Sequence, residues 1–190
     1  SFSDVLTEIL SPYDIGLSLR RSEKTSEPEL ISDRIFIDSS TVSVIIETIP
    51  SASPVITYLA NSFSLKNKST PYSFISALPP TIYADFKDEE IIVNRWLADD
   101  IVAKQGDTLT MVWYDPVYGH RLEEKSKTFI IRGIVDDESK YSDPSLMPDF
   151  PGISGSTTCS DWDAGIPILM DRIREKDEKY WNQYKGTPKA

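Results

Sequence analysis

Apolar and polar residues alternate along much of the chain, a pattern typical of β-strands with one buried face. The alternation at 16–20 and 29–38 predicts two strands of one sheet. Stronger runs at 108–114 and 126–135, joined by the polar residues 115–125, predict two strands paired antiparallel. The pattern therefore indicates a fold in which β-structure is prominent.

A further hairpin is predicted between Val55 and Leu78. Two apolar, aromatic segments lie there on either side of the polar residues 66–69, a loop of the length that hairpins use. Pro79 and Pro80 end the second strand, because a proline cannot donate a backbone hydrogen bond to a neighbouring strand.

Apolar residues at helical spacing predict helices in other segments. A short helix is expected within 1–14, where Pro12 stops the pattern. Residues 39–41 offer N-caps for a second helix that ends at Pro50. The β-branched residues at 42–49 favour a strand equally, and we favour the helix.

Two later helices have clearer boundaries. A strand at 89–93 is followed by a helix at 94–104, with Asn94 as its N-cap and Gly106 as the expected C′ residue. The last helix, at 168–185, is amphipathic.

A long segment, 136–167, separates the predicted strands from the last helix. It is rich in proline and glycine and shows no regular period. Loops of this length are usually functional or docked on a neighbour. The whole pattern predicts an α+β fold with a mixed, mainly antiparallel sheet and several helices.

Length and composition limit the class of protein. A chain of 190 residues forms one domain or two small subdomains. Thirty acidic against twenty basic residues give a net charge of −10, which disfavours nucleic acid as a partner. No apolar run approaches the ~20 residues of a membrane span. Because the chain begins at Ser1 and ends in a turn-like segment, we expect it to be a fragment excised from a longer protein.

Candidate catalytic and metal-binding residues are few. His120 is the sole histidine and lies in a predicted loop, where exposure is the favoured interpretation. Cys159 is the sole cysteine and has acids beside it rather than a cation, so we expect a structural thiol. The acids between 136 and 163 lack the spacing of an EF-hand. We expect no catalytic site, no cofactor and no metal.

Aromatic residues are more numerous than a thin core needs. Trp96 and Trp113 lie within predicted elements and are expected in the core. The surplus rings are expected in part at an interface, since Tyr and Trp are enriched there. The candidate partner-contact residues are Trp162, Tyr180, Trp181 and Tyr184.

The segment 91–135 has a distinctive order. It starts with an Ile-Ile-Val-Asn-x-Trp-Leu-Ala-Asp-Asp helix, continues with Gln-Gly-Asp-Thr-Leu opening a strand, and closes with Phe-Ile-Ile-Arg-Gly-Ile-Val. This order resembles the extracytoplasmic region of FtsX-like and MacB-like ABC transporter permeases, where a helix leads through a Gly-Asp turn into strands ending in Val-x-Gly-Ile/Val. Other stretches similar to a large branch of those permeases are 58–61, 69–73, 145–152 and 184–190. Together the matches span most of residues 13–190.

The resemblance implies that residues 1–190 are one extracytoplasmic region on the periplasmic side of the bacterial inner membrane, within an integral membrane protein. It implies two subdomains, as in MacB-like periplasmic core domains, and a small one is expected near 82–136. The implied role is non-catalytic coupling of cytoplasmic ATP hydrolysis to export or release. The implied partners are the rest of the permease, a second permease copy, the cytoplasmic ATPase indirectly, and a periplasmic adaptor or substrate.

Two other functions stay open at this point. The first is an independent secreted binding module for carbohydrate or protein, with Trp113, Tyr114 and Tyr118 as a stacking platform. The second is a hydrolase that uses His120 or a pair of carboxylates in a cleft.

Overall fold

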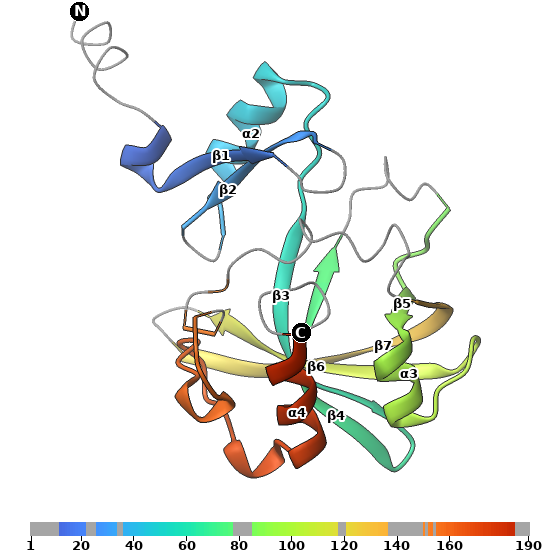
Figure 1. Ribbon diagram of the computed structural model, residues 1–190. Coiled ribbons are helices and arrows are strands. Elements are labelled where there is room, and N and C mark those ends of the chain that lie inside the picture. The colour runs from blue at the N-terminus through green and yellow to red at the C-terminus, as the bar shows by residue number, and fades with distance from the viewer. Residues whose placement is uncertain are drawn as a thin grey trace, which may run out of the picture. The chain divides into compact units, whose positions relative to one another are not determined.

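The computed structural model describes residues 12–21, 26–33, 36–77, 85–117, 121–136, 150, 152–153 and 155–184. Contacts along the chain divide it into two compact units, Ser1–Pro54 and Val55–Ala190. The described helices and strands make an α+β fold with mixed, mainly antiparallel sheet structure, which confirms the predicted class (Figure 1).

The first unit holds a two-stranded antiparallel sheet. In it, Leu17 of the first strand lies opposite Ser32 of the second. The described elements of this unit are the 3₁₀ helix η1 (Pro12–Ile15), β1 (Leu17–Arg21), β2 (Pro28–Ser32) and α2 (Ser39–Thr48). The predicted pairing of two strands is therefore confirmed. The helix predicted within 1–14 lies largely outside the described residues.

Strand β2 ends at Ser32, so the prediction of a strand reaching residue 38 is wrong. Asp38 serves instead as the N-cap of α2, where its Oδ1 accepts a 2.9 Å hydrogen bond from the backbone N–H of Thr41. An N-cap residue has extended backbone, as a strand residue does. The pattern of apolar and polar residues therefore does not show whether Asp38 belongs to a strand or begins a helix. The predicted helix before Pro50 is confirmed and ends at Thr48.

The second unit is built on a five-stranded sheet. Its strand order is β4-β3-β6-β7-β5, with β5 parallel to β7 and every other neighbouring pair antiparallel. The elements are β3 (Ile56–Leu65), β4 (Lys68–Ala77), β5 (Glu90–Asn94), α3 (Arg95–Ile101), β6 (Thr108–Val117) and β7 (Arg121–Val135). The sheet is curled, so that β3 runs across the direction of β6 and β7 in Figure 1. The elements near 82–136 share this sheet with β3 and β4.

Both predicted hairpins are present, with different turns. The β3–β4 turn consists of Lys66 and Asn67 alone, because Ser69 already pairs with Ser64 in the ladder. The β6–β7 strands extend to Val117 and start again at Arg121, so most of the predicted 115–125 loop is strand. Its charged residues favoured a loop, yet Arg121, Glu124 and Lys125 occupy exposed, paired positions of β7.

Helix α3 joins the two edges of the curled sheet, since it contacts both edge strands, β4 and β5. Asn94 caps it as predicted, with Oδ1 accepting a 2.8 Å hydrogen bond from the N–H of Leu97. The expected C′ role of Gly106 is wrong: Val102, at φ 58°, holds the left-handed position that ends the helix. Gly106 forms the next turn, and its N–H donates to the Ile131 carbonyl at 2.8 Å.

Two apolar clusters fill the second unit. The main cluster takes buried residues from β3, β5, β6, β7 and α3, with Leu109 and Ile131 fully enclosed. The second cluster combines Leu59 of β3 with Trp181 and with residues from the long segment after β7. Its buried members are Leu59, Phe150, Ile153, Cys159, Ala164 and Trp181. The described part of the long loop therefore packs its apolar side chains against the sheet and the last helix.

The chain after this loop forms two 3₁₀ helices, η4 (Cys159–Asp161) and η5 (Met170–Arg172), and then α4 (Glu175–Tyr184). The predicted helix at 168–185 is thus too long at its start. Asp177 defines the helix start by accepting a 2.8 Å hydrogen bond from the N–H of Arg174. Ile168, the first residue of the predicted helix, lies outside the observed helix and packs against the second cluster.

Candidate functional site

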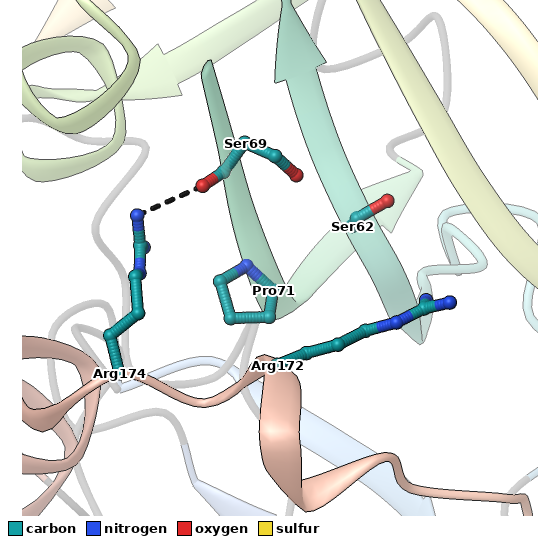
Figure 2. Close-up of a pocket in the computed structure, with 5 residues that line it drawn as sticks. All are labelled: Ser62, Ser69, Pro71, Arg172 and Arg174. Atoms are coloured by element: carbon teal, nitrogen blue, oxygen red, sulfur yellow. Dashed lines mark hydrogen bonds between the residues drawn. The ribbon is translucent and has the colours of Figure 1, made fainter. Parts of the chain in front are cut away.

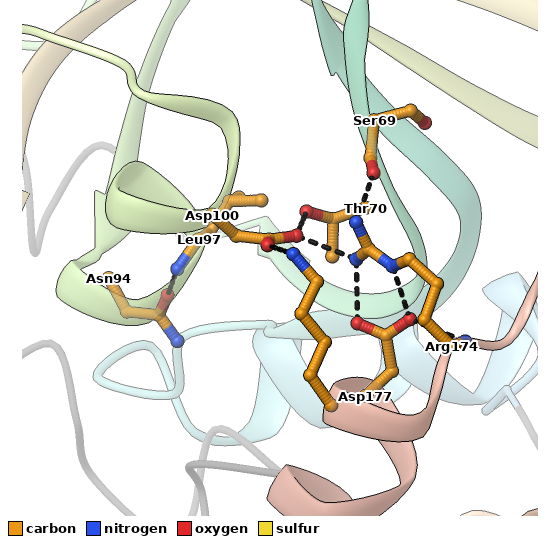
Figure 3. A network of polar contacts seen from close by, with 8 residues as sticks. Ser69, Thr70, Asn94, Leu97, Asp100, Arg174 and Asp177 are labelled. Carbon is orange, nitrogen blue, oxygen red and sulfur yellow. Dashed lines mark hydrogen bonds and ion pairs between the residues drawn. The ribbon is translucent and has the colours of Figure 1, made fainter.

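A network of polar side chains in the second unit centres on Asp100 of α3. The side chain of Asp100 is 5% exposed. One oxygen, Oδ2, accepts from Thr70 Oγ1 of β4 at 2.5 Å and from Arg174 Nη2 at 2.6 Å, and Oδ1 pairs with Lys176 Nζ (Figure 3). Three segments distant in sequence meet at this one carboxylate.

Arg174 extends the network to a second carboxylate. Its Nε and Nη2 donate to Asp177 Oδ2 and Oδ1 at 2.7 and 2.6 Å, a bidentate contact. Its Nη1 donates to the Ser69 carbonyl at 2.9 Å (Figure 3). The guanidinium therefore fixes the start of α4 against both β4 and α3.

The charge state of the network follows from these contacts. Burial raises the pKa of Asp100 and is the largest single effect, but hydrogen bonds from Lys176, Thr70 and Arg174 together outweigh it. The pKa of Asp100 consequently lies below its ordinary value. Hydrogen bonds to Asp177 and Asp100 raise the pKa of Arg174, so the Asp100–Arg174 pair is ionised at neutral pH.

A pocket of about 250 Å³ opens beside the network. It is lined by Ser62, Ser69, Pro71, Arg172 and Arg174. Ser62 and Pro71 are paired across β3 and β4, and the two arginines reach over these strands from the segment that precedes α4 (Figure 2). The pocket therefore combines hydroxyl groups, a proline ring and guanidinium groups.

Sequence reasoning did not select Asp100, Arg174 or Arg172. A signal for Asp100 exists: it lies three residues after Leu97 and next to Ile101, on the apolar side of the predicted helix. A carboxylate at such a position requires a cationic partner. Nothing in the sequence pattern identifies Arg174 as that partner, because the contact spans 74 positions.

The four candidate partner-contact residues all pack against rings of this chain. Trp181 is 7% exposed, so little of its ring is at the surface of this unit. Trp162 meets Trp181 edge-on, with ring centroids 5.5 Å apart. Tyr180 stacks on Trp96 at 4.3 Å and contacts Tyr184 at 4.7 Å. The aromatic side chains of the last helix therefore make ring contacts within their own unit, and their contact with a partner stays a prediction.

The proposed stacking platform is not formed by the described residues. Trp113 is partly buried against the main cluster, as is Trp96, in line with their predicted core positions. Tyr114 follows Trp113 directly in β6, and successive strand residues point to opposite faces. Tyr118 lies outside the described residues.

The residues weighed for catalysis are placed only in part. His120 lies outside the described residues. Cys159 is 2% exposed and packs in the second cluster, which confirms a structural thiol. Within the described parts of the chain, no three His, Cys, Asp or Glu side chains are grouped so that they could hold a metal ion.

Comparisons with known proteins add no relative: no protein-family model and no curated protein matches this chain. Among the described residues, no helix is both long and apolar enough to cross a membrane.

Proposed function

We propose that this chain is the extracytoplasmic domain of an FtsX-like or MacB-like ABC transporter permease. In this role it is non-catalytic, contacts substrate or partner proteins, and couples cytoplasmic ATP hydrolysis to export or release across the envelope. The observation that carries the proposal is that the segment with the family-like order, 91–135, forms one connected element of structure, β5-α3-β6-β7.

The two short motifs of that segment meet in space. The Gly106 N–H donates to the Ile131 carbonyl at 2.8 Å, and the Ile131 N–H donates to the Asp107 carbonyl at 2.9 Å. Gly133 pairs with Ile92 next to a register shift in the β5–β7 ladder. The Gly-Asp turn and the Ile-Arg-Gly-Ile-Val strand therefore depend on one another, which supports treating them as one structural signature rather than two chance matches.

The way the second unit is braced supports a mechanical role. Helix α3 contacts both edge strands, and Asp100 ties it to β4 and to the segment before α4. A displacement applied to any of these elements is transmitted to the others, because each ion pair and hydrogen bond restrains two of them. A domain that passes motion between a membrane segment and a partner needs such restraint.

The proposal places the domain on the periplasmic side of the bacterial inner membrane. Its partners are then the rest of the permease, a second permease copy and, through the membrane segments, the cytoplasmic ATPase. A periplasmic adaptor or a substrate is the further partner.

The test uses the complete gene product that contains this segment, produced in a bacterial host. We expect it to stay in the membrane fraction after alkaline carbonate washing. Protease added to spheroplasts should cleave within this segment, while intact cells protect it. Isolation in mild detergent should recover an ATP-binding protein with it. Release of the product from spheroplasts as a free protein would contradict the proposal and favour a secreted binding module.

A further inference from the structure

We propose that the pocket between Arg172 and Arg174 binds a carboxylate group carried on a short aliphatic stem. The inference concerns a ligand site in the second unit and does not depend on the proposed transport function. It rests on the size of the pocket, on its unused hydrogen-bond donors and on its local charge.

The pocket has room for a group of about the size of one side chain. Its volume of about 250 Å³ is below the roughly 300–1,000 Å³ of sites that enclose drug-sized ligands. Pro71 is buried between the two arginines and offers an apolar surface, while Ser62 and Ser69 present hydroxyl groups (Figure 2). A ligand with one apolar stem and one polar head matches this lining.

Both arginines have donors, but their guanidinium groups lie on opposite sides of Pro71 in Figure 2, so the anionic head is placed at Arg172. A guanidinium carries five N–H groups. The contacts of Arg174 with Ser69, Asp100 and Asp177 use four of them, which leaves one N–H on Nη1, the nitrogen that contacts Ser69. Arg172 is exposed and has no ion-pair partner among the described residues. Its planar fork can therefore bind both oxygens of a carboxylate.

The local charge favours a singly charged anion. The carboxylates of Asp100 and Asp177 balance Arg174 and Lys176, which are in contact with them. Arg172 then supplies one uncompensated positive charge, in a chain whose net charge is −10. A dianion such as phosphate would exceed this charge and face the nearby acids, whereas a carboxylate matches it.

The experiment is a titration of the full 190-residue, ¹⁵N-labelled chain, followed by amide NMR at constant ionic strength. The probes are butyrate, inorganic phosphate, and a short peptide with either a free or an amidated C-terminus. We expect butyrate to give saturable shifts confined to residues that flank the pocket, with Ser62, Ser69 and Arg172 among them. Phosphate should bind more weakly than butyrate.

The peptide separates two sources of the same chemistry. If the free-acid peptide binds more tightly than butyrate and the amidated peptide does not bind, the pocket is assigned to the carboxylate of a polypeptide partner. Butyrate binding at least as tightly as the free-acid peptide assigns it to a small free acid. Either result supports the carboxylate site.

Variants connect the binding to Arg172. Arg172→Gln should weaken butyrate binding about tenfold, because a charge-assisted hydrogen bond is lost, and Arg172→Lys should bind at an intermediate level because it keeps the charge but not the fork. Arg121→Gln is the matched control, since it removes an exposed arginine of β7 that does not line the pocket. Amide shifts that do not saturate, or that are scattered over the surface, would overturn the proposal. It would also be overturned if phosphate bound more tightly than butyrate, or if Arg172→Gln and Arg121→Gln lost equal affinity for butyrate.

Discussion

Asp100 Oδ2 and Arg174 Nη2 lie 2.6 Å apart, and this single contact joins α3 to the segment that starts α4. The carboxylate is almost fully enclosed, at 5% exposure, while the guanidinium side chain is 35% exposed. An enclosed charge without its partner is far less stable than the pair, so removing one partner of this contact should destabilise the second unit.

Arg174→Gln should destabilise the chain by about 1–3 kcal/mol, since it leaves Asp100 and Asp177 with fewer partners. The partial exposure of the guanidinium keeps the loss below that of a fully buried pair. Urea unfolding measures it. Lys179→Gln is the control, because its ion pair with Glu175 is 74% and 82% exposed and should contribute under about 0.5 kcal/mol. Equal midpoints for the two variants would show that the network adds no stability.

Acid should remove the contribution of Asp100. The pKa of Asp100 in the folded chain is lowered from its ordinary value of 3.8. The ionised carboxylate therefore stabilises the fold fully above pH 3.8, and this stabilisation is lost as the pH falls below 3.8. Asp100→Asn imitates the protonated state and should therefore be less stable than the native chain at pH 7. We expect the difference to narrow between about pH 4 and pH 2, as measured by unfolding at each pH. A difference that is constant over this interval would contradict the assignment.

The strands were predictable from sequence because alternation of apolar and polar residues is a local signal. The β3–β4 and β6–β7 hairpins follow from it. The start of α3 was predictable for another local reason, since Asn94 is a favoured N-cap residue. The errors arose where a competing local interaction decides the boundary. Asp38 caps a helix rather than ending the expected strand, and Asp177 accepts the hydrogen bond from Arg174 at the late start of α4.

The candidate site could not be predicted from local patterns in the sequence. Asp100 is recognisable as an acid on the apolar side of a helix, but any of the twenty Lys and Arg residues could have been its partner. The pocket likewise requires Ser62 and Pro71 to lie side by side beneath Arg172, which only the hairpin register and the path of the chain after Ile168 produce. Contacts between residues so far apart in the sequence leave no repeating pattern of apolar and polar residues from which they could be predicted.

The C-terminal end of α3 offers a stabilising change. Val102 adopts φ 58° and is 57% exposed, so its branched side chain is strained and packs little. Val102→Gly should raise the free energy of unfolding by about 1 kcal/mol, because glycine adopts the left-handed region without the Cβ penalty. Val102→Ala, which keeps the Cβ, should gain less. Thermal unfolding compares the three chains, and a lower midpoint for the glycine variant would show that Val102 contributes packing that outweighs the strain.

Cys159 provides a probe of the second apolar cluster, because it is the one cysteine in the sequence and its side chain is 2% exposed. We expect the thiol to react slowly with a thiol reagent in the native chain and rapidly in urea, since reaction requires opening of the cluster. Trp181→Phe should speed the native reaction several-fold, because the smaller ring leaves a cavity beside Trp162 and loosens the cluster. Leu109→Val lies in the main cluster and is the matched control; it should lower global stability with a smaller effect on thiol reaction under native conditions. If both variants accelerate the reaction in proportion to their loss of global stability, Cys159 becomes reactive only when the whole second unit unfolds, and the two clusters form one cooperative unit rather than two.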